Sequence, residues 1–561
     1  MIVLSSSQLA NDSLNTTVCI VGSGAAGITL ACELDGAPFN VLLLEAGDLD
    51  SASGSPDNYQ GTAVKPHPTP AEFRRFGLGG STSVWGGRCV PFDPIDFEKR
   101  DYIANSGWPI SYDEVAHYYP RAMQYCDAGD FDFTASGSLH HAAPTIPGLE
   151  NDSAILNDCI ERYSLPTHFG KRYRQQLEKS PNVTVVLNAR CVAINKQVGA
   201  DQIESVAVVD AGGQRRIIHA QLFVLAVGGI ETPRLLLAAD TAGNGLGNRT
   251  DKLGRFYACH FENLCAKVVA NGAKLAFDFE KTKDDVYCRH KLQFSAAAQH
   301  EHHLLNTAFR LHFPDYSDAT HGSSVMSMIY LAKSVLIKEY RDILQNSAQE
   351  LTPSPNSAHV RNVLLGVPQL LKFGWQWLFL RQLAERKLPY TLVPNADGSF
   401  PLEFNSEQTP LAHSRITLSN AVDQHGLQRV HVDWHISNDD VAAAQRAFHL
   451  LRTAMSRTPA CRLEFDDAQL QARISRSIPV GGHHIGTARM AVSEQQGVVD
   501  TQCAVFGIPN LYLASSAVFP TSSHANPTLT IVALTLRLAE HLKATLANTP
   551  AANTIITGSA S

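Results

Sequence analysis

The 561-residue sequence lacks the features that direct a chain to export, to a membrane or to nucleic acid. Residues 1–17 are polar, with neither an apolar core nor a twin-arginine pair, so no secretory signal is expected. No run approaches the roughly 18 uncharged apolar residues of a membrane span. The net charge is −7 and there is no basic block, which argues against nucleic acid as a partner.

The cysteines form no recognisable framework. They number eleven, an odd count, and no two are spaced as Cys-x-x-Cys. This pattern favours reduced core thiols in a reducing compartment, so we expect a cytoplasmic protein. The absence of Cys-x-x-Cys-His excludes a c-type haem, so any electron acceptor other than oxygen must be a separate molecule.

Two further site types are not expected. Adjacent side chains cannot readily converge on one ion, so the run His300–His303 is interpreted as a solvated loop and no metal site is predicted. No Gly-x-Ser-x-Gly elbow is present, which argues against a hydrolase. What remains is a composition typical of globular proteins, 44% hydrophobic and 18% charged, with length for about two to four domain-sized units.

A nucleotide-binding motif lies near the start of the chain. The apolar run 18–21 enters Gly22-Ser23-Gly24-Ala25-Ala26-Gly27, residues 28–34 have helical apolar spacing, and a second apolar run, 41–44, ends at Glu45. This strand, glycine turn, helix, strand and acid predict a dinucleotide site, with Gly22 in the tight turn, Gly24 beside the pyrophosphate and Gly27 at the helix–strand contact. Glu45 is predicted to bond ribose hydroxyls, which disfavours NADP. From this loop alone FAD and NAD both remain possible.

The remaining pattern predicts two kinds of structure. Strands are expected at 183–194, 206–209, 222–227 and 511–514, with a long helix at 528–546. The alternating segments 415–418 and 430–434 suit an antiparallel sheet, and 361–387 is predicted to be helical. The small, polar residues 551–561 are expected to be a flexible tail.

Four more segments carry a family resemblance. They are 76–87 (FGLGGSTSVWGG), 225–238 (LAVGGIETPRLLLA), 483–490 (HHIGTARM) and 509–534 (PNLYLASSAVFPTSSHANPTLTIVAL). With the first loop, they resemble the glucose–methanol–choline oxidoreductase family, on its bacterial sugar-dehydrogenase and pyranose-oxidase side. The resemblance implies an α/β fold (α+β overall). A Rossmann-like FAD domain would come from residues 1–115, 180–265 and 480–550, and a mainly antiparallel substrate domain from 116–179 and 266–479.

The resemblance also implies how FAD is held. Besides the first loop, the implied cofactor residues are Gly79, Gly80, Ser81, Val84, Val192, Ala226, Ser515 and Thr528. Val84 stands where some relatives have a histidine bonded to the flavin, so non-covalent FAD is expected. Thr528 heads a helix whose N-terminus could stabilise negative charge on the reduced flavin.

A catalytic pair follows from the same resemblance. His483, in His-x-x-Gly-Thr, matches the active-site histidine, and Asn526 matches the second position, where relatives have His or Asn. We expect His483 to take the hydroxyl proton while a hydride passes to flavin N5, and Asn526 to hold the hydroxyl and the product carbonyl. His484 is the competing base, and its side chain should point away from that of His483 if the backbone is extended. His524 is expected to be a loop or supporting residue.

The sequence therefore predicts an FAD-dependent oxidoreductase acting on an alcohol. The substrate would be a sugar, glycoside, cyclitol or polyol-like compound, and the acceptor oxygen or a separate molecule. A non-redox lyase of the same fold, resembling the hydroxynitrile lyases, and a nicotinamide dehydrogenase remain as alternatives. The apolar, aromatic segment 363–383 is either a helix pair packed on the substrate domain or a docking site for a membrane surface, a subunit or an apolar acceptor.

Overall fold

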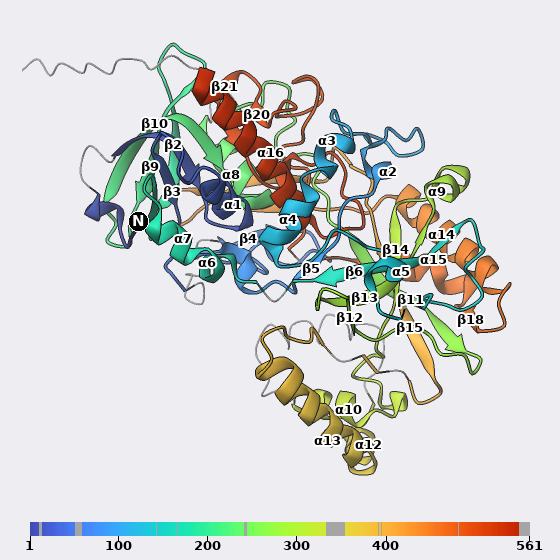
Figure 1. Cartoon of the computed structure of the whole chain (residues 1–561). Coiled ribbons are helices and arrows are strands. Elements are labelled where there is room, and N and C mark those ends of the chain that lie inside the picture. Colours follow the sequence, from blue (N-terminus) through green and yellow to red (C-terminus); the bar gives the residue numbers. More distant parts are fainter. Residues whose placement is uncertain are drawn as a thin grey trace, which may run out of the picture.

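The computed structural model describes residues 1–9, 14–50, 59–141, 143–164, 167–240, 244–332, 354–390, 392–393, 395–480 and 482–548. The predicted flexible tail lies outside these ranges. Figure 1 shows the chain as two sheet-containing halves side by side, with a helical lobe projecting beneath the second half.

The first half is built on a nine-stranded sheet. Its main path is β1 (Ile2–Val3), β7 (Val183–Val186), β3 (Val41–Leu44), β2 (Asn15–Val21), β10 (Arg215–Leu225), β21 (Ile508–Leu513) and β20 (Ala504–Val505). All neighbours up to β21 are parallel, whereas β20 is antiparallel. The antiparallel strands β8 (Arg190–Lys196) and β9 (Ile203–Val209) extend from β10. Such a parallel sheet is the architecture predicted for the nucleotide-binding half.

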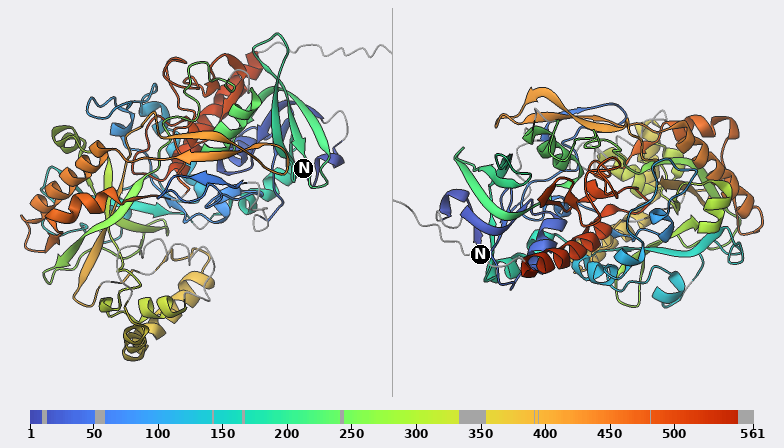
Figure 2. Two further views of the ribbon diagram at one scale, coloured as in Figure 1. Left: turned by 180° about the vertical axis from the view of Figure 1, so that it is seen from behind. Right: turned by 90° about the horizontal axis from the view of Figure 1, so that it is seen from above.

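Helices cover this sheet because its central strands are apolar on both faces. All four residues of β3 are buried. Helix α1 (Ala25–Glu33) follows β2 and packs against the C-terminal helix α16 (Pro527–Asn548), while α8 (Gly228–Ala239) follows β10. The two ends of the described chain therefore share one core. Figure 2, with views from behind and from above, shows α16 running across that half.

The predicted strand 183–194 is interrupted. Residues 187–189 separate β7 from β8, and Asn188 adopts a left-handed backbone conformation with φ of 51°. Asparagine tolerates this conformation better than most residues, so it ends one strand and redirects the chain into the next.

The second half contains a nine-stranded antiparallel sheet. Its path is β18 (Cys461–Glu464), β11 (Phe261–Ala270), β15 (Ser399–Ser406), β14 (Thr307–Leu311), β13 (Tyr287–Phe294), β6 (Ile155–Tyr163) and β5 (Arg88–Cys89), with β12 (Glu280–Lys281) on β13 and β19 (Ile478–Pro479) on β11. Helices α14 (Asn438–Met455) and α15 (Asp467–Ser475) pack against it. Phe309, Phe404 and Phe448 meet edge to face at this contact.

The predicted segments 415–418 and 430–434 pair antiparallel, but they form a separate sheet. Strands β16 (Arg415–Val422) and β17 (Gln428–Asp433) are joined by the parallel strand β4 (Gly61–Ala63). Helix α8 of the first half contacts both β16 and β17. This small sheet therefore packs on the nucleotide-binding half rather than extending the large antiparallel sheet.

Residues 116–179 contact both halves. Helix α4 (Tyr119–Cys126) packs on α16, and α7 (Arg174–Lys179) packs on β7, whereas β6 lies in the antiparallel sheet. The run His300–His303 is not a solvated loop, because α9 (Ala296–His302) contains its first three residues. The remaining short elements are η1 (Ser6–Gln8), η5 (Gly80–Ser83), α2 (Pro94–Phe97), α3 (Asp113–Ala116), α5 (Ala135–Ser138), α6 (Phe169–Arg172), η6 (Ala319–His321) and η8 (Ser516–Val518).

The projecting lobe contains α10 (Ser324–Ala332), α12 (Asn356–Leu365), α13 (Val367–Gln376) and a π-helical turn, Trp377–Gln382. Pro368, in the first turn of α13, fits a helix start and separates the predicted helical run into two. Among the described helices none alone has the length and apolarity of a membrane span, while α12 with the run Val367–Gln382 passes only as a pair bent by 79°.

Candidate active site

A cavity of about 2430 Å³ extends from the nucleotide-binding half to the antiparallel sheet. This volume exceeds that of pockets for single small ligands, about 300–1,000 Å³, and suits a dinucleotide together with a substrate. Most of the predicted site residues line it: Gly22, Gly24, Ala25, Ala26, Glu45, Gly80, Ser81, Val84, Ala226, His483, Ser515, Asn526 and Thr528.

The first glycine loop has the geometry that its spacing predicts. Gly22 has φ of +100°, a conformation that favours glycine. A Cβ on Gly27 would lie 1.8 Å from the carbonyl oxygen of Gly22, so this residue does not line the cavity but lets α1 pack against the turn. A Cβ on Gly24 would meet no protein atom within 4 Å, which leaves the backbone there open to a ligand.

The Glu45 carboxylate ties the walls of the loop together. One oxygen accepts from the Ser23 amide (3.0 Å) and hydroxyl (2.6 Å), and the other from the amides of Gly47 and Gly77 (2.9 Å each). These four bonds use the lone pairs that a carboxylate offers. Glu45 thus anchors the loop in the structure, and its contact with ribose stays a prediction.

The second glycine turn lies against the first. Gly79 and Gly80 have φ of 101° and 52°, and a Cβ on Gly80 would lie 3.2 Å from the Cα of Gly24. Gly79 packs against His168 and Gly170 instead of lining the cavity. Val84 follows at the end of η5 and is 48% exposed.

Val192 is not part of the described cavity wall, whereas its neighbour Cys191 is. Successive side chains of a strand point to opposite faces, and both residues lie in β8. Cys191 is therefore the residue of β8 that borders the cavity, and a contact of Val192 with the cofactor stays a prediction.

His483 and Asn526 meet at the cavity wall. The Asn526 amide (Nδ2) lies 3.1 Å from Nε2 of His483, and Nδ1 of His483 lies 3.0 Å from Nδ1 of His260. Nε2 of His260 in turn lies 2.9 Å from the carbonyl oxygen of Ser522. A carbonyl can only accept, so His260 carries its proton on Nε2 and its Nδ1 accepts from His483. His483 then keeps an unprotonated Nε2 directed at Asn526.

Burial keeps both imidazoles neutral. Desolvation, followed by the neighbouring His260 and the Arg88 guanidinium, holds the pKa of His483 well below its usual range. Burial lowers the pKa of His260 to about 3. The pair is therefore a neutral base with a neutral support behind it at physiological pH.

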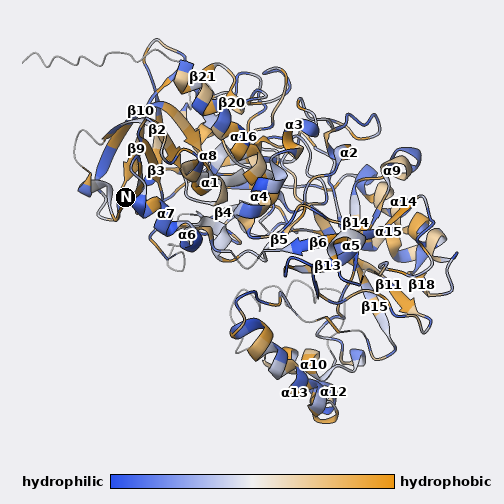
Figure 3. Cartoon of the chain, in the orientation of Figure 1, coloured by the Kyte–Doolittle hydropathy of each residue, from blue (hydrophilic) through white to orange (hydrophobic). Residues whose placement is uncertain are grey.

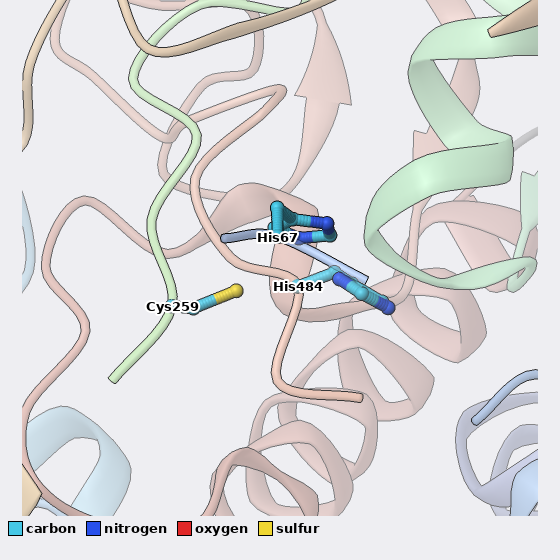
Figure 4. Close-up of side chains that lie close together, drawn as sticks. All are labelled: His67, Cys259 and His484. Atoms are coloured by element: carbon cyan, nitrogen blue, oxygen red, sulfur yellow. The ribbon is translucent and has the colours of Figure 1, made fainter. Parts of the chain in front are cut away.

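His484 points to a different cluster, shown in Figure 4. The Tyr257 hydroxyl lies 2.7 Å from Nε2 of His67, 2.7 Å from Nδ1 of His484 and 3.2 Å from Sγ of Cys259. Within the described residues, the side chains of His67, Cys259 and His484 form the group whose ligand atoms are close enough together to hold a metal ion. Because the phenol oxygen occupies the point on which they converge, the structure favours a hydrogen-bonded cluster over a metal centre.

His524 supports the site from behind. It is fully buried, with Nε2 2.6 Å from the Gln293 amide, 3.4 Å from Nζ of Lys291 and 3.3 Å from the Asp93 carboxylate. Burial lowers its pKa to about 4. It does not line the cavity, which agrees with its interpretation as a supporting residue.

The far end of the cavity is polar, which no sequence motif indicated. Its wall includes Arg88, Tyr163, Glu262, His312, Tyr390 and Glu403. Burial and then the Glu403 carboxylate raise the pKa of Glu262 to about 7. Burial opposes ionisation of Glu403, but Arg310 and His312 hold its pKa at about 2. Arg88, Tyr163, Glu262 and Glu403 come from β5, β6, β11 and β15 and become neighbours through the antiparallel pairing, whereas His312 and Tyr390 lie outside the strands.

Comparison with known proteins gives consistent matches. A family model described as GMC oxidoreductase matches residues 410–535. The chain is 22% identical to 2-methyl-1,2-propanediol dehydrogenase of Mycolicibacterium austroafricanum, covering 94% of this chain and 95% of that one. It is 23% identical to paromamine 6'-oxidase of Streptomyces fradiae, covering 93% and 90% respectively. The match to this model over residues 410–535 and the full-length similarity to such enzymes agree with the resemblance to the GMC oxidoreductases.

Solved structures of oxidases share the fold of this chain. A pyridoxine 4-oxidase from "Mesorbium loti" aligns with a TM-score of 0.54 at 16% identity, covering 94% of this chain and 98% of that one. A fungal aryl-alcohol oxidase aligns with a TM-score of 0.52 at 14% identity, covering 95% and 99%. The predicted family and the mixed α/β fold are thus confirmed.

FAD fits the described residues. The open backbone at Gly24, the N-terminus of α1 behind it and the contact between the two glycine turns form a cradle for a pyrophosphate. Asn526 and Thr528, at the start of α16, lie on the same cavity wall as that cradle. The residues present would therefore hold the dinucleotide at one end and face its reactive ring at the other.

Proposed function

We propose that this GMC oxidoreductase oxidises a CH–OH group of a sugar, glycoside, cyclitol or other polyhydroxylated compound, with His483 as the base. One observation carries the proposal: the hydrogen bonds of His260 leave Nε2 of His483 unprotonated beside Asn526, at the wall of a cavity that fits FAD. When bound, FAD supplies the acceptor for the hydride that leaves the carbon.

His483 and Asn526 divide the work on the substrate oxygen. The hydroxyl donates its proton to Nε2 of His483 as the C–H bond is broken, and the imidazolium that forms keeps its other proton on Nδ1 facing His260. The Asn526 amide cannot take a proton at neutral pH, but its N–H can hold the developing carbonyl oxygen. Base and orienting group are thus separate residues.

The polar end of the cavity supports a hydroxyl-rich substrate. Carboxyl groups of Glu262 and Glu403, the phenols of Tyr163 and Tyr390 and the Arg88 guanidinium offer both donors and acceptors. A hydroxyl-rich substrate can hydrogen-bond to these groups, whereas a simple apolar alcohol offers them a single hydroxyl. A fructose dehydrogenase large subunit of Gluconobacter japonicus, 25% identical over 321 residues, supports the same substrate class.

The decisive experiment follows the absorbance of the purified yellow protein under anaerobic conditions. Sugars, glycosides, cyclitols and aryl alcohols are added in turn, and bleaching of the flavin identifies a substrate. His483→Ala is expected to slow bleaching about 10²–10⁴-fold, the usual contribution of a positioned base. A protein bleached by no alcohol, or an unimpaired His483→Ala variant, would overturn the proposal; the first result would favour the lyase alternative.

Several finer points belong to the same proposal. FAD is held without a covalent bond because Val84 stands in place of the linking histidine, so acid precipitation should leave the flavin in the supernatant. The domain division given above, oxygen or a separate molecule as acceptor, and a cytoplasmic location are also proposed. The eleven cysteines all lie in the described ranges and form no disulfide there, and ten of them are buried, which supports a reducing compartment. Segment 363–383 is proposed as a docking surface.

A further inference from the structure

The helical lobe exposes an unusual concentration of apolar side chains. Ten of the eighteen large apolar side chains exposed in the described residues fall between 360 and 383: Val360, Leu364, Leu365, Val367, Leu371, Trp375, Trp377, Leu378, Phe379 and Leu383. No residue of α13 or of the turn Trp377–Gln382 is buried. Scattered exposed apolar residues are normal, but such a concentration of them on one lobe indicates an interaction surface.

The lobe stands away from both sheets, as Figure 1 shows, and the colouring in Figure 3 shows both hydrophobic and hydrophilic residues along α12 and α13. Leu364, Leu365 and Leu371 are 69–73% exposed. Trp375 is 56% exposed and Trp377 48%. Tryptophan is enriched where a protein meets the boundary between lipid acyl chains and headgroups.

The charge of the lobe indicates what kind of surface binds to it. Residues 354–390 carry five basic side chains and one acidic one, although the whole chain has a net charge of −7. Arg361, Lys372 and Lys387 are exposed on the lobe. A symmetric dimer through this face would bring like charges together, which disfavours a second copy of the chain. An anionic lipid surface instead matches both the apolar and the basic side chains.

We propose that α12, α13 and the turn Trp377–Gln382 form a docking face that lies in the surface of an anionic phospholipid bilayer. The 79° bend between α12 and the run Val367–Gln382 lets both arms rest on a surface instead of crossing it. This inference goes beyond the proposed alcohol oxidation and does not depend on it.

Docking also places the cavity near the bilayer. Residues 313–316, just before η6 and α10, and Pro389 and Tyr390, just after the lobe, line the cavity wall. The segments that connect the lobe to the antiparallel sheet are therefore the same segments that border the substrate end of the cavity.

The test is co-sedimentation of the full-length holoprotein with vesicles of phosphatidylcholine alone or with about one third phosphatidylglycerol, at about 0.1 M salt. We expect binding to the anionic vesicles that weakens as salt is raised. With brominated lipids, quenching should come from Trp375 and Trp377, since Trp108 and Trp434 are buried and the half-buried Trp85 lies at the cavity, away from the lobe.

The variants separate this face from exposed apolar residues in general. Replacing Leu364, Leu365 and Leu371 by serine should weaken partitioning at least about tenfold, because half of the transfer free energy of three leucines exceeds the roughly 1.4 kcal/mol that tenfold requires. The matched control replaces Val198, Val422 and Val492, which are 97%, 51% and 70% exposed, by serine and should bind like the wild type.

A third variant tests the charge argument. Arg361→Gln combined with Lys372→Gln and Lys387→Gln should reduce binding to anionic vesicles and remove most of its salt dependence. No sedimentation with anionic vesicles, or equal loss in the valine control, would overturn the proposal. A discrete dimer that the leucine variant abolishes, without vesicle binding, would assign the face to self-association and overturn it as well.

Discussion

His260 offers the sharpest test of the site, because it acts on the substrate only through His483. In the structure its Nδ1 accepts from Nδ1 of His483 at 3.0 Å while its Nε2 donates to the Ser522 carbonyl at 2.9 Å. His260→Phe removes the acceptor and leaves a buried N–H unpaired. Leaving this N–H unpaired costs about 1–3 kcal/mol. His483 avoids the cost by moving its proton from Nδ1 to Nε2, but Nε2 must be unprotonated to accept the substrate proton.

The magnitude follows from this competition. If the cost of about 1–3 kcal/mol applies only to the tautomer of His483 that is protonated on Nδ1, the rate of flavin reduction falls by about 5- to 150-fold. His483→Ala should cost more, about 10²–10⁴-fold. The KM for the alcohol should change little, because His260 is buried behind His483 and does not line the cavity.

The assay is anaerobic stopped-flow reduction of the flavin at saturating substrate. His260→Gln serves as the matched variant, because its amide oxygen can still accept from Nδ1 of His483, and it should recover much of the lost rate. The reasoning is refuted if His260→Phe reduces flavin at the wild-type rate, or if the glutamine and phenylalanine variants are equally slow with normal thermal stability.

Three other predictions concern the loop, the titration of the base and the core. Gly27→Ala should destabilise the protein and abolish flavin binding, since its Cβ would lie 1.8 Å from the Gly22 carbonyl oxygen. Gly24→Ala should leave the apoprotein stable and only weaken FAD affinity, because a Cβ there meets no protein atom within 4 Å. Thermal melts and flavin absorbance measure the two effects. Flavin reduction should be independent of pH between about 6 and 8, because the pKa of His483 is depressed and protonation inactivates the base only below that range; a fall in rate near pH 6.5 would contradict this. Arg100 and Glu407 form a fully buried pair at 2.6 Å, so Arg100→Met should cost about 3–5 kcal/mol in urea unfolding, and adding Glu407→Leu should recover part of it.

The sequence predicts those parts of the site that depend on local geometry. The glycine loop, Glu45 and the neighbouring His483 and His484 are each indicated by residues close together in the chain, and the two histidines do have different hydrogen-bond partners, as expected if their side chains point apart. His260 could not, because it is 223 residues from His483 and carries no motif. Glu262 and Glu403 likewise become neighbours only through the pairing of β11 with β15.

Errors in the fold arose where tertiary packing decides. The alternating pattern of β16 and β17 predicts strands, but not that β4, more than 350 residues earlier, completes their sheet. The sequence of β8 likewise does not show which of its two faces borders the cavity, where Cys191 rather than Val192 lies. The sequence of the lobe left open whether its apolar segment is packed on the substrate domain or exposed for docking, because a hydrophobic run has the same pattern in both cases.

The packing of α1 against α16 has a consequence for folding during synthesis. The glycine loop precedes α1 directly, whereas α16, which packs on α1, is made much later in synthesis, as is Asn526 just before it. The nucleotide-binding half cannot complete its packing before α16 has been made, so we expect FAD to be retained only after that point. Loss of the C-terminal helix, with only the last described residues 527–548 removed, should therefore abolish cofactor retention as completely as damage to the loop itself.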